Sequence, residues 1–156
     1  MGAVNICQFR SFAGLFLLYL HAMKIIECSK SQEEVLTEVM RISANAALQR
    51  GDAAHVATED NEELLGAFFE EVKAEVVLLL SKYINSDLAF SMPENWDFSL
   101  EKTLKAIVKS VLVYGVLAKW YALSGDSVYG DMFSSTIEEI LSILRKRVKP
   151  VRDGRK

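Results

Sequence analysis

The stretch that decides the fold is residues 97–123, DFSLEKTLKAIVKSVLVYGVLAKWYAL, which carry a continuous apolar stripe at helical spacing. Asp97 or Ser99 is suited to cap this helix, because each offers a side-chain oxygen to an early backbone N–H. Gly115 costs the helix about 1 kcal/mol relative to alanine, so we expect another helix to cross closely there. The stripe consists of Leu100, Leu104, Ile107, Val111, Tyr114, Leu117 and Tyr121.

The segment that follows predicts an antiparallel partner for that helix. Residues 124–126, SGD, form a turn, and another helix is expected from about Ser127 to Val148, because Pro150 prevents its continuation. Two helices joined by so short a turn pack as an antiparallel hairpin. The residues expected to face inward are Met132, Phe133, Ile137, Ile140, Leu141, Leu144 and Val148.

Two further helices are expected upstream. Ser31 and Glu34 fit a capping box for a helix from about Gln32 to Leu48, and Gly51 fits its end. The second of these helices is capped by Thr58, Asp60 or Asn61, and its early acidic residues suit the positive end of the helix dipole. Its inward stripe is Leu64, Phe68, Val72, Val76, Leu79 and Tyr83, widened by Leu65, Phe69 and Leu80.

Within that second helix, Val76–Leu80 is apolar on every side. A helix that is apolar all round is normally buried all round. We therefore expect this part of the helix to lie in the centre of the molecule.

Two short segments lack the helical period. Met23–Glu27 is expected to be an extended lead-in, and Ser86–Ser91 a short strand or an extended arm. Whether that second segment pairs with a neighbouring subunit is left open. Pro93 then keeps the residue before it out of helical angles. The expected fold is all-α, with four main helices, a C-terminal hairpin and a short extended segment near residues 86–91.

Composition supports a single helical domain. The chain has 156 residues, of which 51% are hydrophobic and 25% charged, with only two prolines and eight glycines. So few turn-forming and helix-breaking residues favour long helices over a β-sandwich. We assign residues 23–152 to one helical domain and residues 153–156 to the end of a basic tail. The apolar segment upstream of that domain, residues 11–20, is too short to span a bilayer as a helix.

The first 22 residues stand apart as a doubtful leader. Residues 11–20 are strongly apolar and follow Arg10, which resembles a signal-peptide core, although cleavage after Ala22 is disfavoured by Leu20. The alternatives are a mis-called start, with translation beginning at Met23, or a helix packed in the fold. A genuine signal peptide would imply export.

The sequence does not predict an enzyme. No P-loop, GxGxxG, GxSxG or HExxH pattern occurs, and the two histidines, His21 and His55, lie far apart. The two cysteines, Cys7 and Cys28, have no metal-ligand spacing. We expect no catalytic residue, cofactor, metal or small-molecule substrate.

The charge distribution is the clearest electrostatic feature. Residues 145–156 contain seven basic side chains and one acidic, whereas the rest of the chain has eleven basic and twenty acidic. This basic tail is either a solvated helix end or a surface for an acidic partner, a neighbouring copy or nucleic-acid phosphates. Its candidate residues are Arg145, Lys146, Arg147, Lys149 and Arg152.

Three aromatic residues are candidates for subunit contacts. Trp96, Trp120 and Tyr121 are of the types enriched at interface hot spots. Large aromatic residues also dominate small cores, so core packing is the alternative interpretation.

The order of these parts resembles small helical proteins of the head–tail morphogenesis clusters of tailed bacteriophages and prophages. The first part of the resemblance is an acid-rich start that leads into LLGAFFEE, residues 64–71. The next parts are NWD, residues 95–97, which opens a long helix, and KWY, residues 119–121, which closes it. The last part is RKRVKPVR, residues 145–152. It implies a head–tail connector or neck protein that forms a ring beneath the portal and has no catalytic residues.

Two functions therefore follow from the sequence. The first is a phage-type connector that forms a homo-oligomeric ring, binds the portal or other neck proteins, and contacts DNA backbone through its tail. Such a protein would be cytoplasmic during assembly and later part of the virion. The second is a small cytosolic helical adaptor or regulator that binds one partner protein through an apolar groove.

Overall fold

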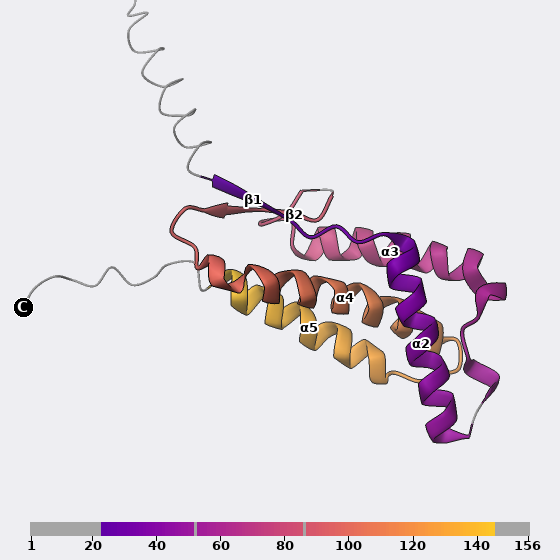
Figure 1. Cartoon of the computed structure of the whole chain (residues 1–156). Helices are drawn as coiled ribbons and strands as arrows, with labels where there is room; N and C mark the ends of the chain where they lie inside the picture. Colours follow the sequence, from indigo (N-terminus) through magenta and orange to yellow (C-terminus); the bar gives the residue numbers. More distant parts are fainter. Residues whose placement is uncertain (1–22, 52, 86, 146–156) are drawn as a thin grey trace, which may run out of the picture.

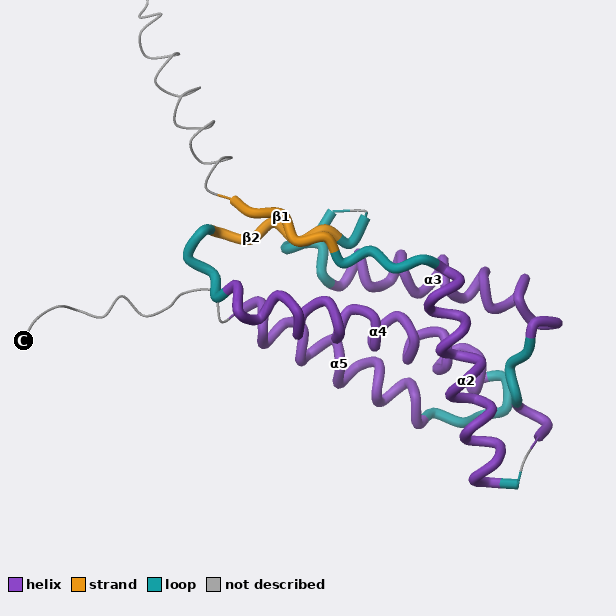
Figure 2. Tube along the Cα trace, in the orientation of Figure 1, coloured by secondary structure: helices purple, strands orange, loops and turns teal. Residues whose placement is uncertain are grey.

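The computed structural model describes residues 23–51, 53–85 and 87–145, which form four α-helices and a small antiparallel sheet (Figures 1 and 2). The expectation of a mostly helical fold with a short extended segment is confirmed. In chain order the elements are β1 (Met23–Glu27), α2 (Gln32–Arg50), α3 (Glu62–Leu79), β2 (Ala89–Pro93), α4 (Glu101–Ala122) and α5 (Val128–Arg145).

α4 is the central helix of the molecule. It packs against α2, α3 and α5, and with α5 it forms the expected antiparallel hairpin (Figure 1). Gly125 lies in the turn between them with φ 80°, a left-handed conformation that glycine adopts without a Cβ penalty. α3 runs antiparallel to α4 on another side, so α3 and α5 point in the same direction (Figure 1).

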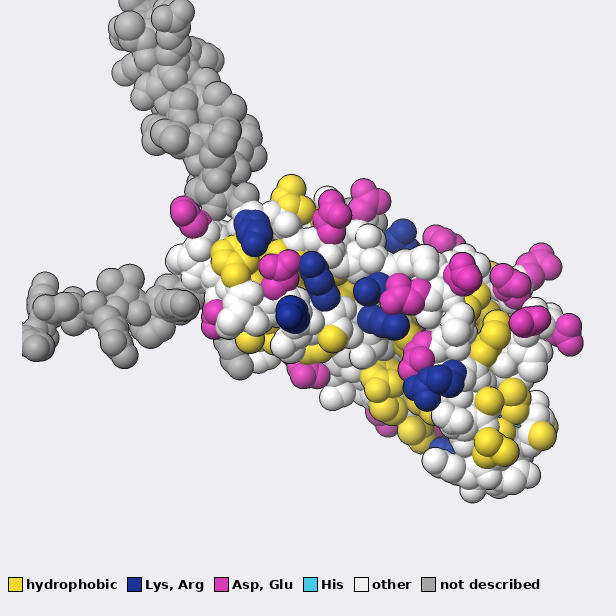
Figure 3. Space-filling view, viewed as in Figure 1, with side chains coloured by type: hydrophobic (Ala, Val, Ile, Leu, Met, Phe, Trp, Pro, Cys, Tyr) yellow, Lys and Arg dark blue, Asp and Glu magenta, His cyan; other side chains and the backbone are white. Residues whose placement is uncertain are grey.

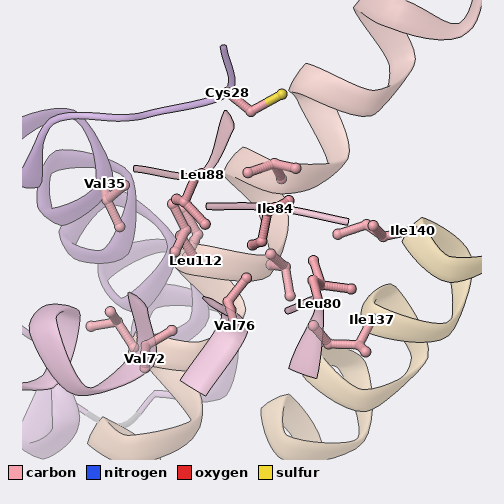
Figure 4. Close-up of a cluster of buried hydrophobic side chains, with 14 of the residues drawn as sticks. Cys28, Val35, Val72, Val76, Leu80, Ile84, Leu88, Leu112, Ile137 and Ile140 are labelled. Atoms are coloured by element: carbon pink, nitrogen blue, oxygen red, sulfur yellow. The ribbon is translucent and has the colours of Figure 1, made fainter. Parts of the chain in front are cut away.

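The close crossing expected at Gly115 is confirmed. A Cβ atom at this position would overlap the side chain of Val72 in α3 and lie 3.1 Å from the ring of Phe133 in α5. Glycine is thus required at this point because two helices approach α4 there together. Side chains from α3, α4 and α5 meet in one apolar cluster, to which Val76, Leu112 and Ile137 belong (Figure 4).

α3 is rotated relative to the expected stripe, and the prediction of its central burial is wrong. Leu78 is 73% exposed and Leu79 49% exposed, although Val76 and Leu80 are fully buried. The reason is that α3 lies at the periphery, where α2 and α4 cover only one of its faces. The buried row is Leu65, Phe69, Val72, Val76 and Leu80, whereas Leu64 is exposed.

The caps expected at Ser31 and Asp97 are formed, whereas Asn61, which precedes α3, makes no side-chain capping bond to that helix. The hydroxyl of Ser31 accepts a hydrogen bond from the Glu34 backbone N–H at 3.2 Å, and Asp97 accepts one from Ser99 at 3.1 Å. The Glu34 carboxylate, however, forms an ion pair with Lys109 of α4 at 3.1 Å. It therefore links α2 to α4, and the reciprocal half of the predicted capping box is replaced by a tertiary contact.

The two extended segments pair with each other within the chain. β1 and β2 are antiparallel, with Met23 opposite Pro93 and Ile25 opposite Ser91. The far side of β2 is covered by the turn after α3, where the Ser91 N–H donates to the Tyr83 carbonyl at 3.2 Å. The strand begins at residue 89, three residues later than the segment expected from the sequence.

Leu88, just before β2, has a φ of 56°, which is unusual for a residue with a branched side chain. Its side chain is buried in the core, and its N–H donates to the Asn85 carbonyl. Burial of the leucine side chain offsets the strain of the left-handed backbone. Among the described helices, none is long and apolar enough to cross a membrane.

Candidate functional site

Trp96 lies in the core. Its side chain is 2% exposed and its ring meets Phe98 edge to face at 5.3 Å. The indole N–H has no hydrogen-bond partner among the described residues, so the ring is held by apolar contact alone. In the single chain Trp96 therefore packs as a core residue, and its ring offers little surface to a partner.

Trp120 and Tyr121 close α4 and have different surroundings. The indole N–H of Trp120 donates to the backbone carbonyl of His55 at 2.8 Å, while the ring stays partly exposed. Tyr121 is buried and stacks on Tyr129 of α5 at 5.1 Å. Of the three aromatic candidates, Trp120 therefore retains the most accessible surface.

A small polar hollow of about 220 Å³ lies beside these residues, between the end of α2 and the α4–α5 turn. Arg50 and Asp126 form an ion pair across it at 3.2 Å, and its lining also includes Tyr121 and His55. The N–H of Val128 and the Arg50 guanidinium hold the pKa of Asp126 below its usual value. The two opposite charges neutralise each other, so this hollow has no net charge with which to attract an ion.

The basic candidate residues begin where α5 ends. Arg145 is the last residue of α5 and its side chain is exposed. Lys146, Arg147, Lys149 and Arg152 lie outside the described residues. The described part of the chain therefore ends with a positive charge at the end of α5.

The acidic residues are concentrated at the start of α3. An open hollow of about 660 Å³ lies between the beginnings of α2 and α3, and its lining includes no lysine or arginine. Its lining residues are Gln32, Glu59, Asp60, Glu62, Glu63, Gly66, Ala67 and Glu70. Figure 3 shows acidic side chains gathered over this end of the molecule, whereas lysines and arginines lie mainly elsewhere.

The acidic start of α3 and Arg145, at the end of α5, lie at opposite ends of the helical body. α3 and α5 run in the same direction, so the start of α3 and the end of α5 are separated by the length of the body (Figure 1). An α-helix of 18 residues is about 27 Å long. The sequence predicted an uneven distribution of charge, but it did not predict that the acidic start of α3 and the end of α5 lie at opposite ends of the body.

The described residues include no group of three or more histidine, cysteine or carboxylate side chains that could hold a metal ion. Cys28, which directly follows β1, is buried, and burial raises the pKa of its thiol to about 11. The thiol therefore stays protonated at neutral pH and has little nucleophilic character there.

No protein-family model matches the chain, and no curated protein or solved structure matches it either.

Proposed function

We propose that the protein is a non-enzymatic structural protein that assembles head to tail into an oligomeric ring, as a phage-type head–tail connector. The proposal is carried by one observation, the separation of the acidic start of α3 from Arg145 at the end of α5, where the basic run of the sequence begins. Two different surfaces that complement each other give a heterologous contact, and such contacts close into rings when the rotation between copies permits.

The partners of such a ring are the portal and other neck proteins. The tail residues from Arg145 onward would face either the acidic end of a neighbour or the phosphates of DNA, since both are anionic. Without interleaved aromatic residues in this tail, contact with DNA would be made to its backbone and not to its bases. The resemblance of the sequence to connector proteins supports this assignment, which places the protein in the cytoplasm during assembly and then in the virion.

Light scattering after gel filtration of the full chain, at low and at high salt, tests the proposal. We expect a discrete oligomer of more than two copies at low salt, visible as rings by negative-stain electron microscopy, and smaller species at high salt because exposed charge pairs are screened. A protein that stays monomeric at every salt and protein concentration, and that purified portal protein does not recruit, would contradict it.

An adaptor that binds one partner protein is a second candidate. It is favoured by two hollows of about 470 and 330 Å³ that flank α4, one toward α5 and one toward α2. They share Ser110 and Tyr114, and Ile107 lines the first and Ile42 the second. An amphipathic helix is the kind of ligand that such a groove accepts. This function predicts a monomer or dimer in the same light-scattering experiment.

A further inference from the structure

We propose that the outer face of α3 is the surface on which a neighbouring copy docks its basic segment, residues 145–152. This inference rests on the proposed head-to-tail assembly and names the two surfaces that meet. The outer face is the row that points away from the core, in which residues recur at alternating steps of three and four. Its members are Leu64, Ala67, Glu71, Ala74 and Leu78, all exposed.

The first argument is that this face is apolar but uncovered. Leu64 is 42% exposed and Leu78 is 73% exposed, and the small side chains of Ala67 and Ala74 lie between them. The elements that pack on α3, chiefly α2 and α4, do so on its opposite face. A helix that is apolar on two faces is normally buried on both, so the outer face is expected to be covered in the functional assembly.

The second argument is the charge beside this apolar row. Glu63 and Glu70 flank it on one side and Glu75 on the other, and none of the three has an ion-pair partner among the described residues. Glu71, within the row, is paired with Lys119 of α4 at 3.0 Å. An apolar floor between acidic edges favours a cationic partner with some apolar side chains.

These charges also argue against pairing of α3 with α3 of a second copy. In an antiparallel pair centred on the middle of the helix, Glu70 would lie near its own counterpart, and like charges across a helix pair repel. Residues 145–152 have the complementary composition, because Val148 and Val151 alternate with cations. The cations of this segment are Arg145, Lys146, Arg147, Lys149 and Arg152.

The length of the basic segment indicates that the acidic half of this face binds the segment of a neighbouring copy and not that of its own chain. Lys149 is four residues beyond Arg145, so the chain between them spans at most roughly 14 Å. α3 is about 27 Å long, and its acidic start lies at the far end of the body from Arg145 (Figure 1). The first cations of the tail therefore fall short of the acidic half of their own α3, whereas a copy stacked end to end brings them directly to it.

Charge reversal in the full chain tests the inference. We expect Glu63→Lys with Glu70→Lys on α3 to weaken self-association by about tenfold or more, because two attractions become repulsions. Arg145→Glu with Arg147→Glu should weaken it equally. A 1:1 mixture of the two variants should restore assembly at least in part, because the introduced glutamates of one variant then meet the introduced lysines of the other. The control Glu138→Lys with Glu139→Lys makes the same charge change on the exposed side of α5 and should have no effect.

A matched pair of leucine substitutions tests the apolar part of this face. Leu78→Gln should weaken association without lowering the melting temperature, since this side chain makes few contacts within the chain. Leu48→Gln replaces a leucine that is 83% exposed on α2, outside the proposed surface, and should leave association unchanged.

The outcomes separate this inference from the proposed function. If both charge-reversed variants still form the wild-type oligomer, head-to-tail assembly stands and the α3 surface is overturned. If the wild-type chain is monomeric, the proposed assembly fails, and a synthetic peptide of residues 143–156 then tests the surface directly. Binding of that peptide that is lost in the Glu63→Lys, Glu70→Lys variant would support the surface, and absence of binding would overturn it.

Discussion

α3 and α4 are both long apolar helices, yet one is enclosed and the other is not. α4 has α2, α3 and α5 around it, and its buried residues extend over most of its circumference. α3 is no less apolar, but its neighbours cover one face and leave Leu64, Leu78 and Leu79 exposed. Apolar periodicity thus identifies which residues seek burial, whereas the number of helices available to cover them is a property of the whole fold.

Matched leucine truncations in the two helices should give the largest difference. Leu112 of α4 is fully buried, so Leu112→Ala should lower the free energy of unfolding by about 2–5 kcal/mol through lost contacts and a residual cavity. Leu78→Ala on the outer face of α3 should change it by no more than about 0.5 kcal/mol, measured at a protein concentration where the chain is dissociated. Similar losses for the two variants, in urea unfolding followed by circular dichroism, would contradict the distinction between the helices.

Two glycine substitutions should give the next largest contrast. Gly115→Ala places a methyl group against Val72 and Phe133 and should cost about 1–3 kcal/mol, because both neighbours must move. Gly130 lies in α5 with open space around its missing side chain, so Gly130→Ala should stabilise the protein by up to about 1 kcal/mol. Thermal unfolding of the two variants would give melting temperatures shifted in opposite directions, and a stabilising Gly115→Ala would show that the crossing is looser than described.

A smaller change in stability is expected at Ser43 of α2, which bonds the segment that leads into α3. The buried hydroxyl of Ser43 donates to the Met40 carbonyl and accepts from the Ala57 N–H, both at 3.0 Å. Ser43→Ala leaves the Ala57 N–H buried without this partner and should cost roughly 1 kcal/mol. Ser110→Ala, which removes a hydroxyl bonded to the Ala106 carbonyl of its own helix, is the control and should be nearly neutral. Hydrogen exchange at Ala57 should accelerate in the first variant alone.

Most of the helical framework follows from local sequence. Caps at Ser31 and Asp97, the terminating Gly51 and the short turn after α4 define helix ends within a few residues, because each signal acts on its nearest neighbours. The pairing of β1 with β2 was missed, since its partners are far apart in the sequence and each strand is only five residues long. No short-range pattern specifies such a contact.

The candidate site was predicted only in part. Residue type marked Trp96, Trp120 and Tyr121, but an aromatic side chain is equally suited to a core and to an interface, and packing decides between them. A subunit-contact role for these residues stays a prediction. The acidic residues at the start of α3 were assigned to the helix dipole, and their position opposite the end of α5 depends on the direction of three helices in space.

The two tryptophans also give the protein a spectroscopic signature. Trp96 lies just before α4, is buried, and finds no partner for its N–H in the part of the chain that the structure describes. Trp120 lies near the end of α4, where it is partly exposed and its N–H donates to a backbone carbonyl. Indole fluorescence shifts to longer wavelength in polar surroundings, so the two rings should emit at different wavelengths. Replacing either one with phenylalanine would leave a single fluorophore, and unfolding could then be followed separately at each end of the central helix.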